Sequence, residues 1–159
     1  MLGGWAFNAA GRYQNGFPSQ IWQSSNNSGL FGSTQRPNVV AGSSLLIAGA
    51  SASSYDPTCQ CIRWLNPSAF TAAPAFTFGN EPRTDPDART PGQSETDFSI
   101  QKSQRVGGKS ITVRLDLLNI FNDPLLLGPV TTFGTGNFGF VNTVGGFARS
   151  EQIHVRVAW

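Results

Sequence analysis

Four stretches in which apolar and polar residues alternate constrain the fold of this chain more than any other feature. A period of two places apolar and polar side chains on opposite faces of a β-strand. In the last stretch the apolar positions are Ile153, Val155, Val157 and Trp159. The sequence therefore predicts four strands, each with one apolar and one polar face, over residues 4–13, 96–106, 109–121 and 147–159.

The predicted strands are long, at about 10 to 13 residues each, whereas strands of soluble proteins most often have about 5 to 6. Eleven residues tilted by about 45° rise roughly 25 Å, which is the height of the apolar band on an outer-membrane barrel. The strand lengths thus favour a sheet that crosses the outer membrane and contacts its lipid.

The connections between these strands alternate between long and short. Gly107-Gly108 predicts a tight hairpin, whereas residues 14–95 and 122–146 form long connections. Short periplasmic turns and long outside loops are typical of transmembrane barrels. We therefore expect an all-β fold: an antiparallel transmembrane-type β-barrel segment of four long strands with two long extracellular loops. Eight of the ten prolines lie in the first loop, which we expect to be a folded insertion.

The composition of the chain argues against nucleic-acid binding and against a membrane-spanning helix. Charged residues make up 13% of the chain and the formal net charge is +2, without a Lys- or Arg-rich run. Nucleic-acid binding is therefore not expected. No stretch approaches the roughly 18 apolar residues of a membrane helix.

Polar residues at alternate strand positions are expected to face the barrel lumen. They are Asp97, Arg105, Arg114, Asp116, His154 and Arg156. The neighbours of His154 along its own strand, Gln152 and Arg156, would not orient an imidazole as a buried aspartate does. We therefore expect no catalytic residue, no cofactor and no enzymatic activity. Lys102 falls on the apolar face, where it must reach the headgroups or the strand must avoid lipid.

Two loop segments raise the question of metal binding. Cys59 and Cys61 lack the further Cys or His residues of a zinc site, and both a disulfide and two free thiols remain open. The acidic segment 80–89, with Glu81, Asp85 and Asp87, lacks the glycine and distal glutamate of an EF-hand. We expect a solvated turn there and no metal site.

Three phenylalanines in the second half of the chain allow two interpretations. They could line a binding surface, or they could pack the loop onto the barrel rim. These residues are Phe138, Phe140 and Phe147.

The segment "DFSIQKSQRVGGKSITVRLDLLNIFND" resembles the penultimate hairpin of TonB-dependent outer-membrane receptors, most closely the Oar-like group. The matching residues are Asp97, Ser99, Lys102, Arg114, Asp116, Asn119, Phe121 and Asn122. Further segments resemble the same group in the same order: "RPNVVAG" (36–42), "WLNPSAF" (64–70), "FGN" (78–80), "FGFV" (138–141) and the terminal strand.

The resemblance implies the C-terminal part of a 22-stranded barrel that is plugged by another domain and takes up nutrients with energy from TonB. It implies that upstream strands and a plug complete the barrel, so that this part alone does not transport. Val155, Val157 and Trp159 resemble the signal that the barrel-assembly machinery recognises. The expected location is the cell outer membrane.

A second interpretation is a structural or adhesive β-subunit. A four-stranded sheet leaves two unpaired edges, and such edges pair readily with other strands. Copies of the chain would then assemble into an oligomer or an extracellular fibre.

Overall fold

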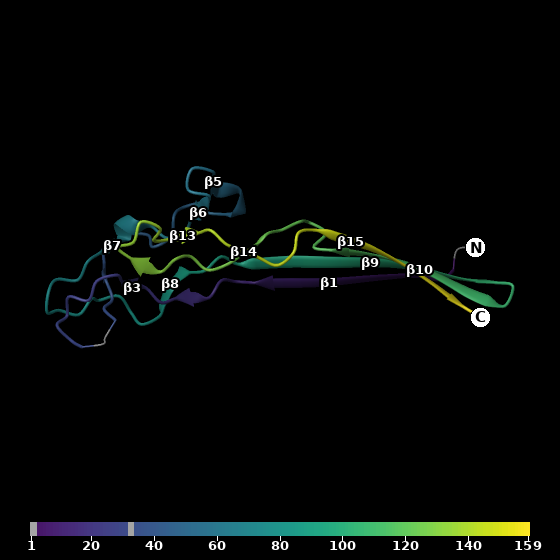
Figure 1. Ribbon diagram of the computed structural model, residues 1–159, viewed down its shortest axis with the longest axis horizontal. Coiled ribbons are helices and arrows are strands. Elements are labelled where there is room, and N and C mark those ends of the chain that lie inside the picture. Colours follow the sequence, from purple (N-terminus) through teal and green to yellow (C-terminus); the bar gives the residue numbers. More distant parts are fainter. Residues whose placement is uncertain (1–2, 32–33) are drawn as a thin grey trace. The chain divides into compact units, whose positions relative to one another are not determined.

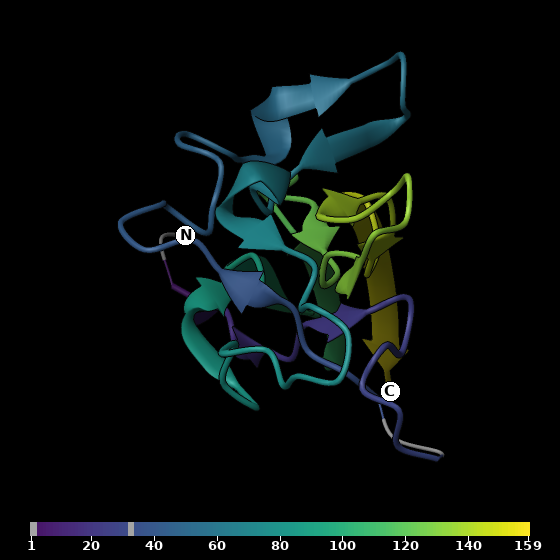
Figure 2. The same cartoon turned by 90° about the vertical axis from the view of Figure 1, so that its left-hand side faces the viewer.

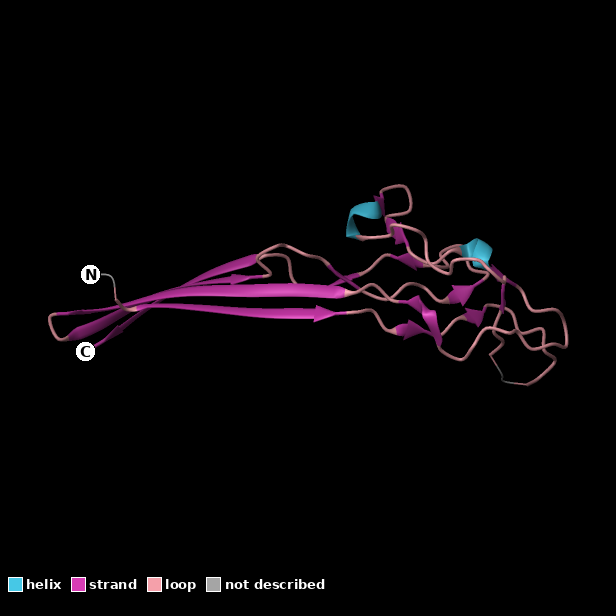
Figure 3. Ribbon diagram, turned by 180° about the vertical axis from the view of Figure 1, so that it is seen from behind, coloured by secondary structure: helices cyan, strands magenta, loops and turns pink. Residues whose placement is uncertain are grey.

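The computed structural model describes residues 3–31 and 34–159, and its regular structure consists almost entirely of β-strands (Figures 1 and 3). Two short 3-10 helices, η1 (Ala52–Ser54) and η2 (Pro67–Ala69), are the exceptions among these residues. The described part contains no helix long and apolar enough to cross a membrane. The chain divides into two compact units. We call them the sheet unit (residues 3–14, Gln93–Leu125 and Gly145–Trp159) and the insertion unit (Asn15–Gly92 and Leu126–Val144).

Four long strands form the sheet unit: β1 (Trp5–Gln14), β9 (Gln93–Val106), β10 (Lys109–Leu118) and β15 (Ser150–Ala158). They pair in the order β1-β9-β10-β15, and each pairing is antiparallel. The predicted all-β antiparallel fold is confirmed. The first long connection leaves after Gln14 and returns at Gln93, and these two residues are direct register partners.

The register places all apolar alternations on one face of the sheet. Ile100 lies opposite Phe7 on one side and Leu115 on the other, and Leu115 lies opposite Ile153. Because directly paired residues share a face, the four strands form one continuous apolar surface. Many of its members are exposed in the chain, among them Phe7, Val113, Ile153, Val155 and Val157.

Three strand boundaries differ from the prediction by about three residues, and each has a local cause. β9 begins at Gln93 rather than 96, because residues 93–95 still pair with the end of β1. β10 ends at Leu118 rather than 121, because Asn119 adopts a left-handed backbone with φ of 49°. β15 begins at Ser150 rather than 147. The Phe147 carbonyl and the Arg149 amide instead bond to side chains of the turn after β10.

Lys102 lies on the apolar face, as expected, and its charge is locally satisfied. The Nζ atom donates a hydrogen bond to the Gly3 carbonyl oxygen and lies 4.9 Å from the centre of the Trp5 ring. A cation over an aromatic face is attracted by the negative ring surface. The ammonium group therefore has a partner at the edge strand of the sheet.

Short strands make up the insertion unit (Figure 2). They are β2 (Pro18–Ser19), β3 (Trp22–Gln23), β4 (Asn38–Val39), β5 (Tyr55–Asp56), β6 (Cys61–Arg63), β7 (Phe70–Thr71), β8 (Asp85–Arg89), β12 (Thr132–Phe133) and β13 (Phe140–Val141). β2 pairs with β8, β3 with β12, β4 with β7, and β6 lies between β5 and β13. β11 (Leu125–Leu126) pairs with β14 (Val144–Gly145).

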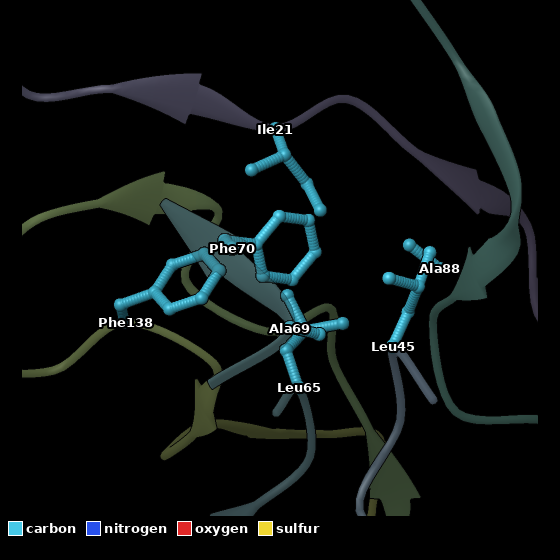
Figure 4. Packing of buried hydrophobic residues seen from close by; sticks show 7 residues of the cluster. All are labelled: Ile21, Leu45, Leu65, Ala69, Phe70, Ala88 and Phe138. Carbon is cyan, nitrogen blue, oxygen red and sulfur yellow. The ribbon is translucent and has the colours of Figure 1, made fainter. Parts of the chain in front are cut away.

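The insertion unit has a hydrophobic core of its own (Figure 4), as expected for a folded insertion. Its buried residues are Ile21, Leu45, Leu65, Ala69, Phe70, Ala88 and Phe138. The rings of Phe70 and Phe138 meet edge to face with centroids 5.4 Å apart, a favoured aromatic geometry. These residues come from segments far apart in the sequence, so the core ties the two long connections together.

The segments "RPNVVAG" and "FGN" dock against each other through reciprocal hydrogen bonds. The Asn80 side chain accepts from the Val39 amide at 2.6 Å, and the Asn38 side chain accepts from the Asn80 amide at 2.9 Å. At Gly79 an added Cβ would lie 1.9 Å from the Arg36 carbonyl oxygen, so only glycine allows this approach. These two motifs are therefore structural.

Candidate functional site on the polar face of the sheet

The predicted lumen-facing residues all share the polar face of the sheet. Arg114 lies opposite His154, and Asp116 lies opposite both Ser99 and Gln152. Arg114, Asp116, His154 and Arg156 line one hollow together with Gln101 and Thr112. Four of the six predicted residues are thus brought together.

Asp116 is the centre of this cluster. Its Oδ1 accepts a 2.8 Å hydrogen bond from Nε of Arg114, and its Oδ2 lies 3.4 Å from Nε2 of His154. The Asp116 side chain is only 13% exposed, whereas those of Arg114 and His154 are 47% and 59% exposed. The largely buried carboxylate of Asp116 therefore orients the side chains of Arg114 and His154, which are more exposed than it is.

The position of Asp116 corrects the sequence reasoning about His154. That reasoning considered Gln152 and Arg156 on the same strand and found no aspartate to orient the imidazole. The structure supplies one from the neighbouring strand, because a diagonal position across an antiparallel pair lies within reach of long side chains. Predicting from the sequence that β10 pairs with β15 could have revealed the contact between Asp116 and His154.

Asp97 and Arg105 lie outside this cluster. Oδ1 of Asp97 accepts a 2.9 Å hydrogen bond from the Asn119 amide, so Asp97 holds the turn that ends β10. Arg105 lies opposite Ser110, close to the Gly107-Gly108 hairpin. Both residues remain on the polar face.

Two of the three residues expected to form an assembly signal, Val155 and Val157, lie on the apolar face. Val155 is 66% exposed and Val157 is 47% exposed, and they face Val113 and Ile111 across the register. Trp159 is 94% exposed and follows the last residue of β15.

Cys59 and Cys61, for which two states were open, are joined by a disulfide in the hairpin between β5 and β6. Asp56 lies beside it and accepts a 2.9 Å hydrogen bond from the Thr58 amide, which lowers the pKa of that carboxyl. Arg63 lies 3.4 Å from the same carboxylate.

The three phenylalanines differ in their exposure and in the unit to which they belong. Phe138 is buried in the core of the insertion unit at 4% exposure, and Phe140 is partly covered, with the Arg63 guanidinium 5.3 Å from its ring centre. Phe147 is 92% exposed in the sheet unit. Packing thus explains Phe138, and only Phe147 presents its ring openly.

The acidic segment 80–89 is not the solvated turn that the sequence suggested. Glu81 is 1% exposed and Asp85 is 5% exposed, whereas Asp87 lies at the surface. Burial and the nearby Asp85 raise the pKa of Glu81 from 4.5 to about 7. No group of three or more His, Cys, Asp or Glu residues that could hold a metal occurs within residues 3–31 and 34–159.

Comparison with known proteins gives one family. Neither the curated proteins nor the solved structures contain a match to this chain. The family described as "Outer membrane beta barrel domain" matches residues 1–152, nearly the whole length. The two-faced antiparallel sheet is what such a domain requires, because lipid-facing and lumen-facing residues alternate along its strands. The chain therefore belongs to the outer membrane beta barrel domain family, which assigns it to the outer membrane.

Proposed function

We propose that this chain is the C-terminal part of a TonB-dependent receptor-like transporter of the outer membrane, with ligand capture by its insertion unit. The observation that carries the proposal is the pair of faces on one sheet: a continuous apolar surface and a polar surface centred on Asp116. The resemblance of residues 97–123 to the receptor hairpin supplies the finer assignment.

The role of each face follows from the solvent that it meets. Ile100, Leu115 and Ile153 would contact lipid, since they form the apolar surface. The cluster of Arg114, Asp116 and His154 would face the lumen and contact a plug domain through hydrogen bonds and ion pairs. The chain has no enzymatic role in this proposal, and the cluster orders neighbouring strands.

The connections support an assignment of the end of the sheet that would face the cell exterior. Both long connections leave from the end of the sheet where Gln14 pairs with Gln93 and Leu118 with Ser150. The hairpin at Gly107-Gly108 marks the opposite end, which would face the periplasm. TonB and the barrel-assembly machinery are the partners implied on that side, and missing upstream strands would complete the barrel.

Labelling of intact cells tests the orientation. An epitope inserted at Gly49, where no other atom lies within 4 Å of an added Cβ, should bind antibody on intact cells. The same epitope at Gly108 should bind only after the outer membrane is permeabilised. The reverse pattern would contradict the proposal.

Growth assays test the transport role. Strains lacking this gene or tonB would be compared on limiting ferric chelates, cobalamin or glycans. Both deletions should impair growth on the same nutrient. A nutrient defect in the gene deletion that tonB deletion does not reproduce would exclude TonB-driven uptake.

The unpaired edges of the sheet support a second candidate, a structural or adhesive subunit. Within the described residues β1 and β15 each pair on one side only. Copies of the chain could complete each other at these edges and form an oligomer or fibre. Light scattering of the purified chain in detergent separates the candidates, because only the subunit forms a discrete oligomer or growing filament by itself.

A further inference from the structure

The hollow on the polar face of the sheet contains more positive than negative charge. Arg114 and Arg156 line it together with the carboxylate of Asp116, so two arginines against one aspartate leave a net charge of +1. His154 adds an imidazole, which becomes a further positive charge when it is protonated. The other described residues that line the hollow carry no charge. A positive charge that its surroundings do not balance raises the local concentration of anions.

Asp116 satisfies only part of the Arg114 guanidinium. Nε of Arg114 donates a 2.8 Å hydrogen bond to Oδ1 of Asp116, and the two Nη nitrogens donate to no group among the described residues. The Arg114 side chain is 47% exposed, so these donors are open to the hollow. A guanidinium presents its N–H donors in a rigid planar fork. The bond at Nε therefore fixes the plane of the fork and leaves the Nη donors for a ligand.

The guanidinium of Arg156 has no hydrogen-bond or ion-pair partner in the described part of the chain. Arg156 lies directly opposite Thr112, and Arg114 lies directly opposite His154. The two arginines are therefore diagonal neighbours on one face, on strands β15 and β10. Diagonal positions are about 7–8 Å apart, which is within reach of long side chains. One small anion between the two side chains would contact both guanidinium groups.

We propose that this hollow binds an oxyanion of a small molecule, a carboxylate or a phosphate group, between Arg114 and Arg156. The planar fork of arginine matches both groups, because two parallel N–H donors meet two oxygen atoms. Oγ1 of Thr112 lies 3.0 Å from Oγ of Ser103, so when it accepts from Ser103 its own proton is available to the anion. The hollow has a volume of about 630 Å³, whereas small-molecule sites have roughly 300–1,000 Å³. It therefore has room for the remainder of the molecule.

A metal cation does not fit the same hollow. Asp116 is the only carboxylate among the described residues that line it, and its Oδ1 already accepts from Arg114. Hard cations need several oxygen ligands, and two arginines repel them. The anion site lies in the sheet unit, whereas ligand capture is proposed for the insertion unit. It needs neither TonB nor a plug domain, so anion binding can fail while the transport role stands, and the reverse.

Calorimetric titration of the full chain in detergent with sodium phosphate, and separately with sodium citrate, tests the proposal. Sodium chloride at equal ionic strength is the control, because it supplies negative charge without an oxyanion. We expect saturable binding of phosphate, citrate or both, and the comparison of the two shows which oxyanion the site prefers.

Three variants locate the site. Arg156→Gln should weaken binding on the order of tenfold or more, since one charge-assisted interaction is lost. Arg114→Lys keeps the charge and should also weaken binding, because it removes the fork. Arg105→Gln removes an arginine of the same face that lies outside the hollow, and it should leave the affinity unchanged.

Thermal unfolding of the unmutated chain keeps the test decisive if a variant fails to fold. A bound anion raises the melting temperature in proportion to the logarithm of its concentration above the dissociation constant. We expect phosphate or citrate to raise it more than sodium chloride does at equal ionic strength. The absence of such a difference for both anions would overturn the proposal. Equal affinity in the unmutated chain and Arg156→Gln would overturn it too.

Discussion

The backbone amide of Asn119 donates a 2.9 Å hydrogen bond to Oδ1 of Asp97 on the neighbouring strand β9. Asn119 is 7% exposed, and its left-handed backbone ends β10. Its Nδ2 donates to the carbonyl oxygens of Asp123 and Phe147, and its Oδ1 accepts from the Asp123 amide. One side chain thus joins the end of β10 to the segment that leads into β15.

Asn119→Ala should lower the free energy of unfolding by about 4–5 kcal/mol, since three side-chain hydrogen bonds are lost. Each lost hydrogen bond contributes about 1 kcal/mol, and alanine is disfavoured at positive φ by about 1–2 kcal/mol. Urea titration of the folded protein in detergent measures the change. Asn119→Gly keeps the backbone freedom and should recover the conformational part only. Equal stability of Asn119→Ala and the unmutated protein would contradict the role of this side chain.

The two faces of β15 predict opposite responses to an added charge. Val155→Arg should reduce the folded fraction in the outer membrane, because a lipid-facing arginine costs about 2–4 kcal/mol at the bilayer midplane. Gln152→Arg, on the polar face opposite Asp116, should fold normally. Heat-modified migration on gels reports the folded fraction. Similar loss in both variants would show that the apolar face does not meet lipid.

The alternation of the sequence was sufficient to predict the sheet, because strand faces follow from residue parity alone. It identified the polar-face positions of Arg114, Asp116 and His154 but not their contacts, since a diagonal pair depends on the register between β10 and β15. The sequence pattern also did not predict the burial of Glu81, for a related reason. Pro37, which holds its amide, lies 44 residues earlier in the sequence, and local composition around Glu81 is that of a turn.

The disulfide between Cys59 and Cys61 predicts that the folded chain has no reactive thiol. Maleimide should not label the purified protein until a reductant is added, after which both cysteines should react. Urea-denatured protein without reductant is the control, because it separates a bonded cysteine from a merely buried one. Labelling of that denatured sample would show that the two thiols are free.

The raised pKa of Glu81 predicts a pH-dependent stability whose sign follows from proton counting. The folded chain holds the Glu81 proton up to a pH of about 7, whereas the unfolded chain releases it near 4.5. The folded state therefore binds more protons between these values, and the free energy of unfolding should fall as the pH rises from 4.5 to 7. The loss is on the order of 1–3 kcal/mol, since each unit of pKa shift corresponds to about 1.4 kcal/mol. Urea titrations in EDTA at pH 5, 6, 7 and 8 measure this loss of stability.

Glu81→Gln should flatten the fall in the free energy of unfolding, because the amide does not titrate and can donate to Asp85. Asp87→Asn removes an exposed carboxylate of the same segment and should keep the slope. A slope that survives in Glu81→Gln would assign the pH dependence to another group.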